Sequence, residues 1–111
     1  MHTIIIVLDP AKLSNPDLDL RYVIPERIET ASNGAIQDDG YDYIDTEGSS
    51  SLGIFLKTES AAENWPLILK LFQDETFMEN DLSLSAEIFI SENDGEDISN
   101  CTLVYSPAPS V

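Results

Sequence analysis

The sequence predicts one α+β domain in which two helices pack on one face of an antiparallel sheet. Strand-like apolar segments alternate with two helical patterns, and the run over residues 4–8 is apolar throughout. The length of 111 residues suits one hydrophobic core, and 42% hydrophobic residues is too large a share for a disordered chain. We expect the domain to span residues 1–106, with residues 107–111 as a flexible tail.

The first expected element is a strand over residues 3–8. Its continuous β-branched run is typical of a strand buried on both faces of a sheet. Prolines punctuate the following segment, residues 11–19, which is therefore predicted to be a loop with room for one helical turn capped by Asn15.

A short helix is predicted from Pro25 to residue 31. Proline suits the first helical position, and Gly34 is free to adopt the positive φ that ends a helix. The spacing of the apolar residues gives this helix an inner stripe of Ile24, Ile28 and Ala31.

Residues 35–45 have two interpretations. They form either one strand with a bulge or a tight hairpin that turns at Asp39 and Gly40. We favour a strand centred on residues 41–44. A polar loop over residues 46–51 then leads to a clearer strand over residues 52–58.

The second helix carries the stronger pattern, with apolar residues at helical spacing: Trp65, Ile68, Leu69 and Phe72. Ser60 and Glu63 form a capping pattern for its start. A start at Asn64 is the alternative, because it places Pro66 in the first turn, where proline breaks no hydrogen bond. We expect the helix to end near Asp74.

The last part of the chain predicts two more strands. Apolar residues alternate over residues 82–90, a turn is expected at residues 93–95, and a final strand is expected over residues 101–105. The resulting order is β-α-β-β-α-β with an added C-terminal strand. This order favours a ferredoxin-like antiparallel sheet, with other α+β arrangements left open.

No catalytic constellation is found. His2 stands at a strand start that would hold a base poorly, and Cys101 is expected to be a small buried hydrophobe. The glycine-rich phosphate loops and the nucleophile elbow are absent. We therefore predict a protein that is not an enzyme and needs no cofactor.

Acidic runs occur at two places, but neither has the spacing of a calcium-binding loop. Solvated loops without a functional metal ion are expected for both runs, which are Asp38, Asp39, Asp42 and Asp45, and Glu92, Asp94, Glu96 and Asp97.

The charge limits the class of partner. The chain has 21 acidic and five basic residues, so its formal net charge is −16. Nucleic acid and an anionic membrane surface are disfavoured, because binding them requires clustered Lys and Arg. A basic protein surface is attractive. The N-terminal segment lacks the basic residues and apolar length of a signal peptide, so we expect a cytoplasmic protein, with export by an unusual route left open.

One segment combines acids with aromatic residues near a glycine. Aromatic side chains supply anchoring area at interfaces, and aspartates supply charge-assisted hydrogen bonds to Arg and Lys. The predicted partner-binding residues are Asp38, Asp39, Tyr41, Asp42, Tyr43 and Asp45. Under the alternative interpretation, the two tyrosines share a strand face and only pack, while the aspartates point to water.

The stretch NPDLDLRY at residues 15–22, with IPERI at 24–28 and DDGYDY at 38–43, resembles small acidic bacterial immunity proteins of toxin systems. The resemblance covers the first half of the chain. It implies a cytoplasmic stoichiometric inhibitor that occludes a toxin, commonly a basic nuclease. The alternative function is a regulatory or scaffold domain that forms a homodimer through its sheet, with Phe89 on the exposed face.

Overall fold

The computed structural model describes residues 1–15, 17, 19–46, 49–93 and 98–107. The strands are β1 (His2–Leu8), β2 (Ile36–Thr46), β3 (Ser49–Thr58), β4 (Ala86–Ser91) and β5 (Thr102–Tyr105). The helices are α1 (Leu20–Ala31) and α2 (Ala61–Asp74), and the short 3-10 helices are η1 (Pro10–Lys12), η2 (Leu82–Leu84) and η3 (Ile98–Asn100).

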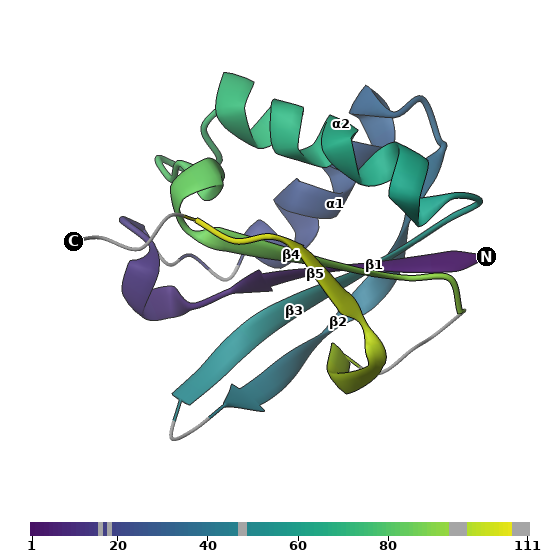
Figure 1. Cartoon of the computed structure of the whole chain (residues 1–111). Helices are drawn as coiled ribbons and strands as arrows, with labels where there is room; N and C mark the ends of the chain where they lie inside the picture. Colours follow the sequence, from purple (N-terminus) through teal and green to yellow (C-terminus); the bar gives the residue numbers. More distant parts are fainter. Residues whose placement is uncertain (16, 18, 47–48, 94–97, 108–111) are drawn as a thin grey trace.

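The strands form one antiparallel sheet in the order β2-β3-β1-β4-β5. Both helices lie on the same face of this sheet (Figure 1). The first four strands have the ferredoxin-like order, and β5 extends the sheet beyond β4. The predicted fold class and the added C-terminal strand are confirmed.

The core lies between the helices and the sheet. Alternate residues of the central strand β1, Ile4, Ile6 and Leu8, are fully buried in it. The helices contribute Leu20, Ile24, Ile28, Ala61, Ile68 and Phe72. The Phe72 and Phe77 rings meet edge to face with centroids 5.5 Å apart. Burial of these apolar side chains supplies the main stabilisation of the fold.

The predicted start of the first helix was wrong. The helix begins at Leu20, so that Pro25 lies inside it, and Ala31 is exposed. The buried stripe is Leu20, Ile24 and Ile28, one turn earlier than predicted. Pro25 cannot donate to the Arg21 carbonyl, but the earlier start buries Leu20, which offsets the lost bond. The end was predicted correctly: Gly34, at φ 85°, donates from its N–H to the Glu29 carbonyl at 2.9 Å.

For the second helix the capping pattern was the correct signal. The helix begins at Ala61, and the Ser60 side chain accepts a hydrogen bond from the Glu63 N–H at 3.4 Å. His2 Nδ1 accepts a bond of 3.0 Å from the Ala61 N–H. These two bonds satisfy the N–H groups of Ala61 and Glu63 in the first turn of the helix. The helix therefore starts three residues before Asn64 and contains Pro66 in its interior.

The strand predicted over residues 82–90 is only half a strand. Asp81 Oδ1 accepts a hydrogen bond from the Ser83 N–H, which caps η2, and Leu84 is 71% exposed. The strand begins at Ala86.

The loop expected at residues 11–19 has its helical turn earlier than predicted. The turn is η1, and its cap is Asp9 and not Asn15.

The bulged-strand interpretation of residues 35–45 is confirmed. β2 is continuous, and its register against β3 shifts between Asp38 and Tyr41. Gly40 lies in this bulge at φ 96°, a conformation that favours glycine. The bulge places both tyrosines that follow it, Tyr41 and Tyr43, opposite the core residues Ile54 and Leu52 of β3.

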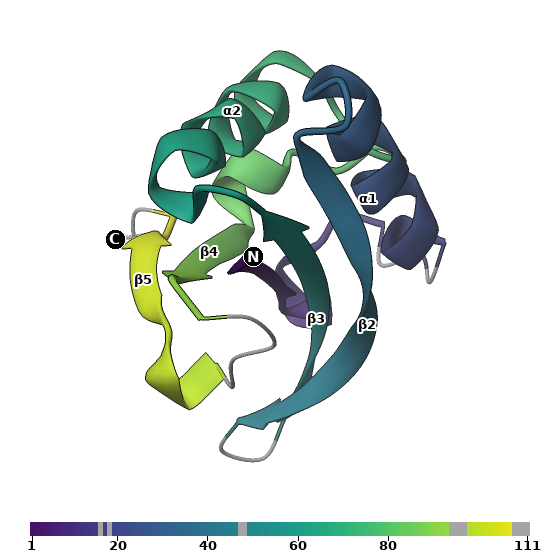
Figure 2. The same ribbon diagram turned by 90° about the vertical axis from the view of Figure 1, so that its right-hand side faces the viewer.

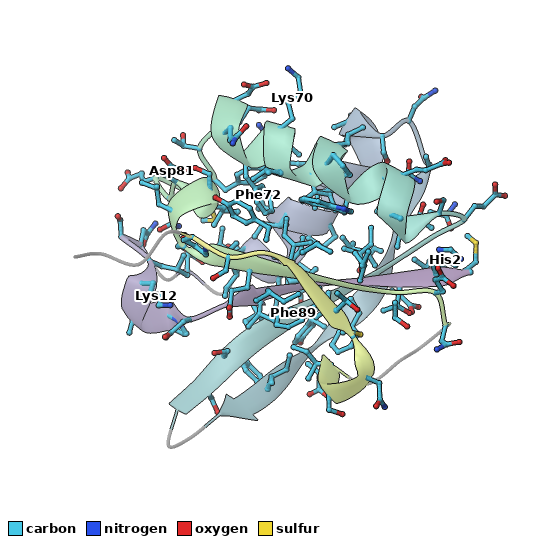
Figure 3. All side chains as sticks on the ribbon, in the orientation of Figure 1. His2, Lys12, Lys70, Phe72, Asp81 and Phe89 are labelled. Carbon is cyan, nitrogen blue, oxygen red and sulfur yellow. The ribbon has the colours of Figure 1, made fainter. Side chains whose placement is uncertain are left out.

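The second face of the sheet is covered in part. Ile5 is fully buried there, between its register partners Phe55 and Phe89. Phe89 is half-buried and lies on the side of the sheet away from the helices, opposite to Phe72 (Figure 3). Thr3 Oγ1 donates a hydrogen bond of 2.7 Å to the Asn93 carbonyl, and this bond holds the chain that follows β4 against this face. β1 is therefore buried on both faces, as predicted. The turn predicted at residues 93–95 and the tail at 107–111 lie mostly outside the described residues.

A tight turn over residues 77–80 connects α2 to η2. The backbones of Phe77 and Asn80 exchange two hydrogen bonds of 2.9 Å. Met78 and Glu79, between them, have φ values of 49° and 72°. Both residues therefore adopt the left-handed conformation, which is unfavourable for a residue with a Cβ atom.

Replacing Glu79 by glycine is expected to stabilise the protein by about 0.5–1 kcal/mol relative to Glu79→Ala, because only glycine relieves the left-handed backbone. Glu79→Ala removes the same charge and is the matched control. Urea denaturation of the two variants measures the difference. Equal free energies of unfolding would show that this turn is not strained.

Candidate protein-binding surface

The predicted acidic and aromatic segment lies on β2, the edge strand of the sheet next to α1 (Figure 2). Asp38, Asp39 and Asp42 are exposed, and Asp38 Oδ1 accepts a hydrogen bond of 2.9 Å from the Gly40 N–H inside the bulge. The backbone of Asp45 pairs with Ser50 of β3, whereas its side chain lies outside the described part of the structure.

Tyr22 of α1 joins Tyr41 and Tyr43 of β2 in a row of rings, here called the tyrosine ladder. The centroids of Tyr22 and Tyr41 are 6.3 Å apart, and those of Tyr41 and Tyr43 are 6.5 Å apart, both edge to face. The three side chains are 55%, 40% and 52% exposed. The two strand tyrosines do share a face and contact each other, but 40% of Tyr41 and 52% of Tyr43 remains exposed to solvent.

The register of β2 divides the predicted site residues. Asp38, Tyr41 and Tyr43 pair with Leu56, Ile54 and Leu52, so they lie on the helix-covered side of the sheet. Asp42 pairs with Gly53 and lies on the other side, where its Oδ1 accepts a bond of 2.8 Å from the Tyr43 N–H. The ladder and Asp38 therefore form one surface, and Asp42 stands apart from it.

Arg21 supports the ladder from within. Its guanidinium carbon lies 4.7 Å from the centroid of Tyr22 and 5.1 Å from that of Tyr41. Burial lowers the pKa of Arg21, the three ladder tyrosines raise it, and the net shift is upward, so this side chain stays charged. Its Nε atom is buried without a hydrogen-bond partner. Tyrosine rings from two elements are thus held together by one cation.

The cations that do form ion pairs within the described ranges lie elsewhere. Arg27 pairs with Glu75 and stands 5.3 Å from the centroid of Phe77. Lys70 pairs with Asp74 at 3.6 Å on the outer side of α2, away from the sheet (Figure 3). These pairs neutralise acids of α2 and its end, and leave the acids beside the ladder to solvent.

A shallow groove of about 480 Å³ opens beside the ladder, between α1 and the beginning of β2. We call it the acidic groove; it is lined by Tyr22, Glu26, Glu29, Thr30, Asn33, Gly34 and Asp38. One wall carries two glutamates of α1, and the other carries an aspartate of β2. All three carboxylate-bearing residues are exposed.

Sequence reasoning missed Tyr22, Glu26 and Glu29 as members of this surface. They are spaced i, i+4 and i+7, which places them on one helix face once the helix includes Tyr22. The prediction began the helix at Pro25 and so left Tyr22 outside it. A predicted helix that continued N-terminally past Pro25 would have placed these three residues on one face.

The residues considered for chemistry have structural surroundings. His2 is the first residue of β1, near the N-terminal end of the chain (Figure 3), and its Nδ1 atom accepts a hydrogen bond from the first N–H of α2. Cys101 is half-buried before β5, less deeply than the predicted buried hydrophobe, and it is not disulfide-bonded. Across the described ranges no three metal-ligating side chains gather into a site. The acids at 94, 96 and 97 lie outside those ranges.

Comparison with known proteins leaves the chain without a match: no family model fits the sequence, and no curated protein or solved structure is significantly similar to it. None of the helices in the described ranges has the length and apolar character needed to cross a lipid bilayer. The function must therefore be inferred from the surface itself.

Proposed function

We propose that this protein is a non-enzymatic inhibitor of the immunity type, which binds a basic toxin through the tyrosine ladder and the acidic groove. The observation that carries the proposal is the ladder: three tyrosines from two elements, in which the middle ring contacts both outer rings and all three are substantially exposed. An exposed aromatic cluster of this kind is typical of the centre of a protein interface.

The charge of the chain supports a basic partner. A net charge of −16 on 111 residues accelerates encounter with a positive surface and repels acidic competitors. The ladder then supplies apolar contact area, and Asp38 with the glutamates of α1 supplies charge-assisted hydrogen bonds at its edge.

Inhibition follows from the same complementarity. A nuclease binds a polyanion through a basic surface, and an acidic domain seated on that surface excludes the nucleic acid. The resemblance of residues 15–22, 24–28 and 38–43 to acidic immunity proteins supports this class of target. Such an inhibitor acts by occupancy in the cytoplasm and needs neither cofactor nor catalytic residue.

A photo-crosslinking amino acid placed at Tyr43 tests the docking surface. In a native lysate at low salt it is expected to capture a basic protein, with capture reduced at high salt because exposed charges are screened. The same probe at Leu84, an exposed residue of η2 next to β4, is the control. Equal capture from both positions would contradict the assignment of the surface.

The inhibitor role has its own test. Co-expression with the product of the adjacent reading frame is expected to restore growth if that product is a basic toxin. If the captured partner is neither toxic nor inhibited, the chain would still be a binding protein, but the immunity function would be excluded.

Self-association is the second candidate, favoured by the other face of the sheet. Phe55, Ile5, Phe89 and Leu103 are register partners that form an apolar row across four strands, and Leu103 is 46% exposed. Sedimentation over a range of concentrations distinguishes this candidate. A monomer at every concentration would exclude it.

A further inference from the structure

Tyr22 belongs to two structures at once. Its ring packs with the guanidinium of Arg21 within the ladder, and it also lines the acidic groove. Arg21 itself does not line the groove. Part of the Tyr22 ring is therefore left to face an occupant that comes from outside the chain.

The occupant of the groove is expected to be a cation. Glu26 and Glu29 stand on one wall and Asp38 on the other, so a positive group between them meets carboxylates from both sides. Asn33 and Gly34 line the end of the groove, where α1 has its C-terminus and its dipole is negative. Neither described ion pair of the protein involves these three acids.

The tyrosine ring indicates which cation. The intramolecular contact of Arg21 shows that Tyr22 and Tyr41 accept a guanidinium at 4.7 and 5.1 Å from their centroids. A guanidinium is planar and weakly hydrated, so it stacks on a ring and presents its donors to two carboxylates in one plane. An ammonium group is compact and more strongly hydrated, and it loses more of its solvation at such a site.

We propose that the acidic groove receives an arginine side chain of the partner, stacked against Tyr22 and paired with Glu26, Glu29 and Asp38. This rests on the proposed function, because the partner is taken to be a basic protein. The groove gives that partner a chemical signature: an arginine, rather than a lysine, projecting beside the area that the ladder covers.

The test does not require the partner. N-acetyl-arginine methylamide and the corresponding lysine derivative are titrated at constant ionic strength against the isotope-labelled protein, with amide shifts as the measurement. Arginine is expected to shift the amides of Glu29, Asn33 and Gly34, with an affinity about threefold tighter than lysine. Equal affinities, or shifts spread evenly over the surface, would overturn the proposal.

Variants locate the effect. The triple variant E26Q/E29Q/D38N is expected to abolish the localised shifts, whereas E79Q/E87Q/E92Q, with the same net charge of −16 + 3 = −13, is expected to retain them. Tyr22→Phe should keep the preference for arginine and Tyr22→Leu should remove it, since only the former keeps an aromatic face. Equal losses in the two triple variants would reduce the effect to bulk charge and overturn the site.

The failures of the two proposals are distinguishable. If the probe at Tyr43 captures a basic protein but the groove does not prefer arginine, the arginine site is overturned and the proposed docking surface stands. Arginine selectivity with no capture from Tyr43 would leave the groove as an arginine site and count against the inhibitor.

Discussion

Replacing Asn80 by alanine is expected to lower the free energy of unfolding by about 3 kcal/mol or more, because this buried side chain makes several hydrogen bonds that are lost together. Asn80 is 1% exposed. Its Oδ1 accepts a bond of 2.7 Å from the Asn15 N–H, and its Nδ2 donates to the carbonyls of Asn15 at 2.7 Å and Phe77 at 3.0 Å. The side chain thus fastens the connection before α1 to the turn after α2.

Asn15→Ala is the matched control for this variant. The Asn15 side chain makes one bond in the same contact, from Nδ2 to the Met78 carbonyl at 3.0 Å, and its loss is expected to cost about 1 kcal/mol. Urea denaturation of both variants measures the difference. If Asn80→Ala cost no more than Asn15→Ala, the two connections would not be held by this side chain.

Much of the fold could be predicted because the strongest signals are local and agree with the tertiary structure. The apolar run at residues 4–8 is the central strand, and Gly34 ends α1 with a positive φ. The order of elements was sufficient to suggest the sheet topology, because a β-α-β-β-α-β chain has few ways to cover one sheet face with both helices.

The errors occurred where tertiary contacts override a local rule. Pro25 and Pro66 both look like helix starts, yet each lies inside a helix whose first turn is fixed by other groups. Burial of Leu20 extends α1 backward, and His2, far away in sequence, satisfies the first N–H of α2. A single-sequence pattern contains neither contact.

The candidate site was predicted only in part, because some of its residues come together through tertiary packing. The two strand tyrosines are two positions apart in the sequence, and period-2 alternation places them on one face. Tyr22 and Arg21 join them only through the packing of α1 on the sheet, which the mistaken helix start concealed. The alternation also separates Asp42 from the tyrosines, although it lies between them in the chain.

Replacing Tyr41 by alanine is expected to weaken the association with the basic partner about 100-fold, the effect of losing a central aromatic anchor. Tyr41 is the middle ring of the ladder. It contacts Tyr22, Tyr43 and the guanidinium of Arg21, so its removal leaves the two outer rings without a common neighbour. Tyr41→Phe keeps the ring and should bind nearly as the parent does.

The measurement is the dissociation constant for the partner captured from Tyr43, determined by calorimetry at one salt concentration. Leu84→Ala removes an exposed apolar side chain of η2 and is expected to leave binding unchanged. Because Tyr41 is 40% exposed on an edge strand, Tyr41→Ala should remain folded, and its melting curve separates lost binding from lost structure. Parental binding by a folded Tyr41→Ala protein would mean that charge alone attracts the partner and that the ladder is not part of the interface.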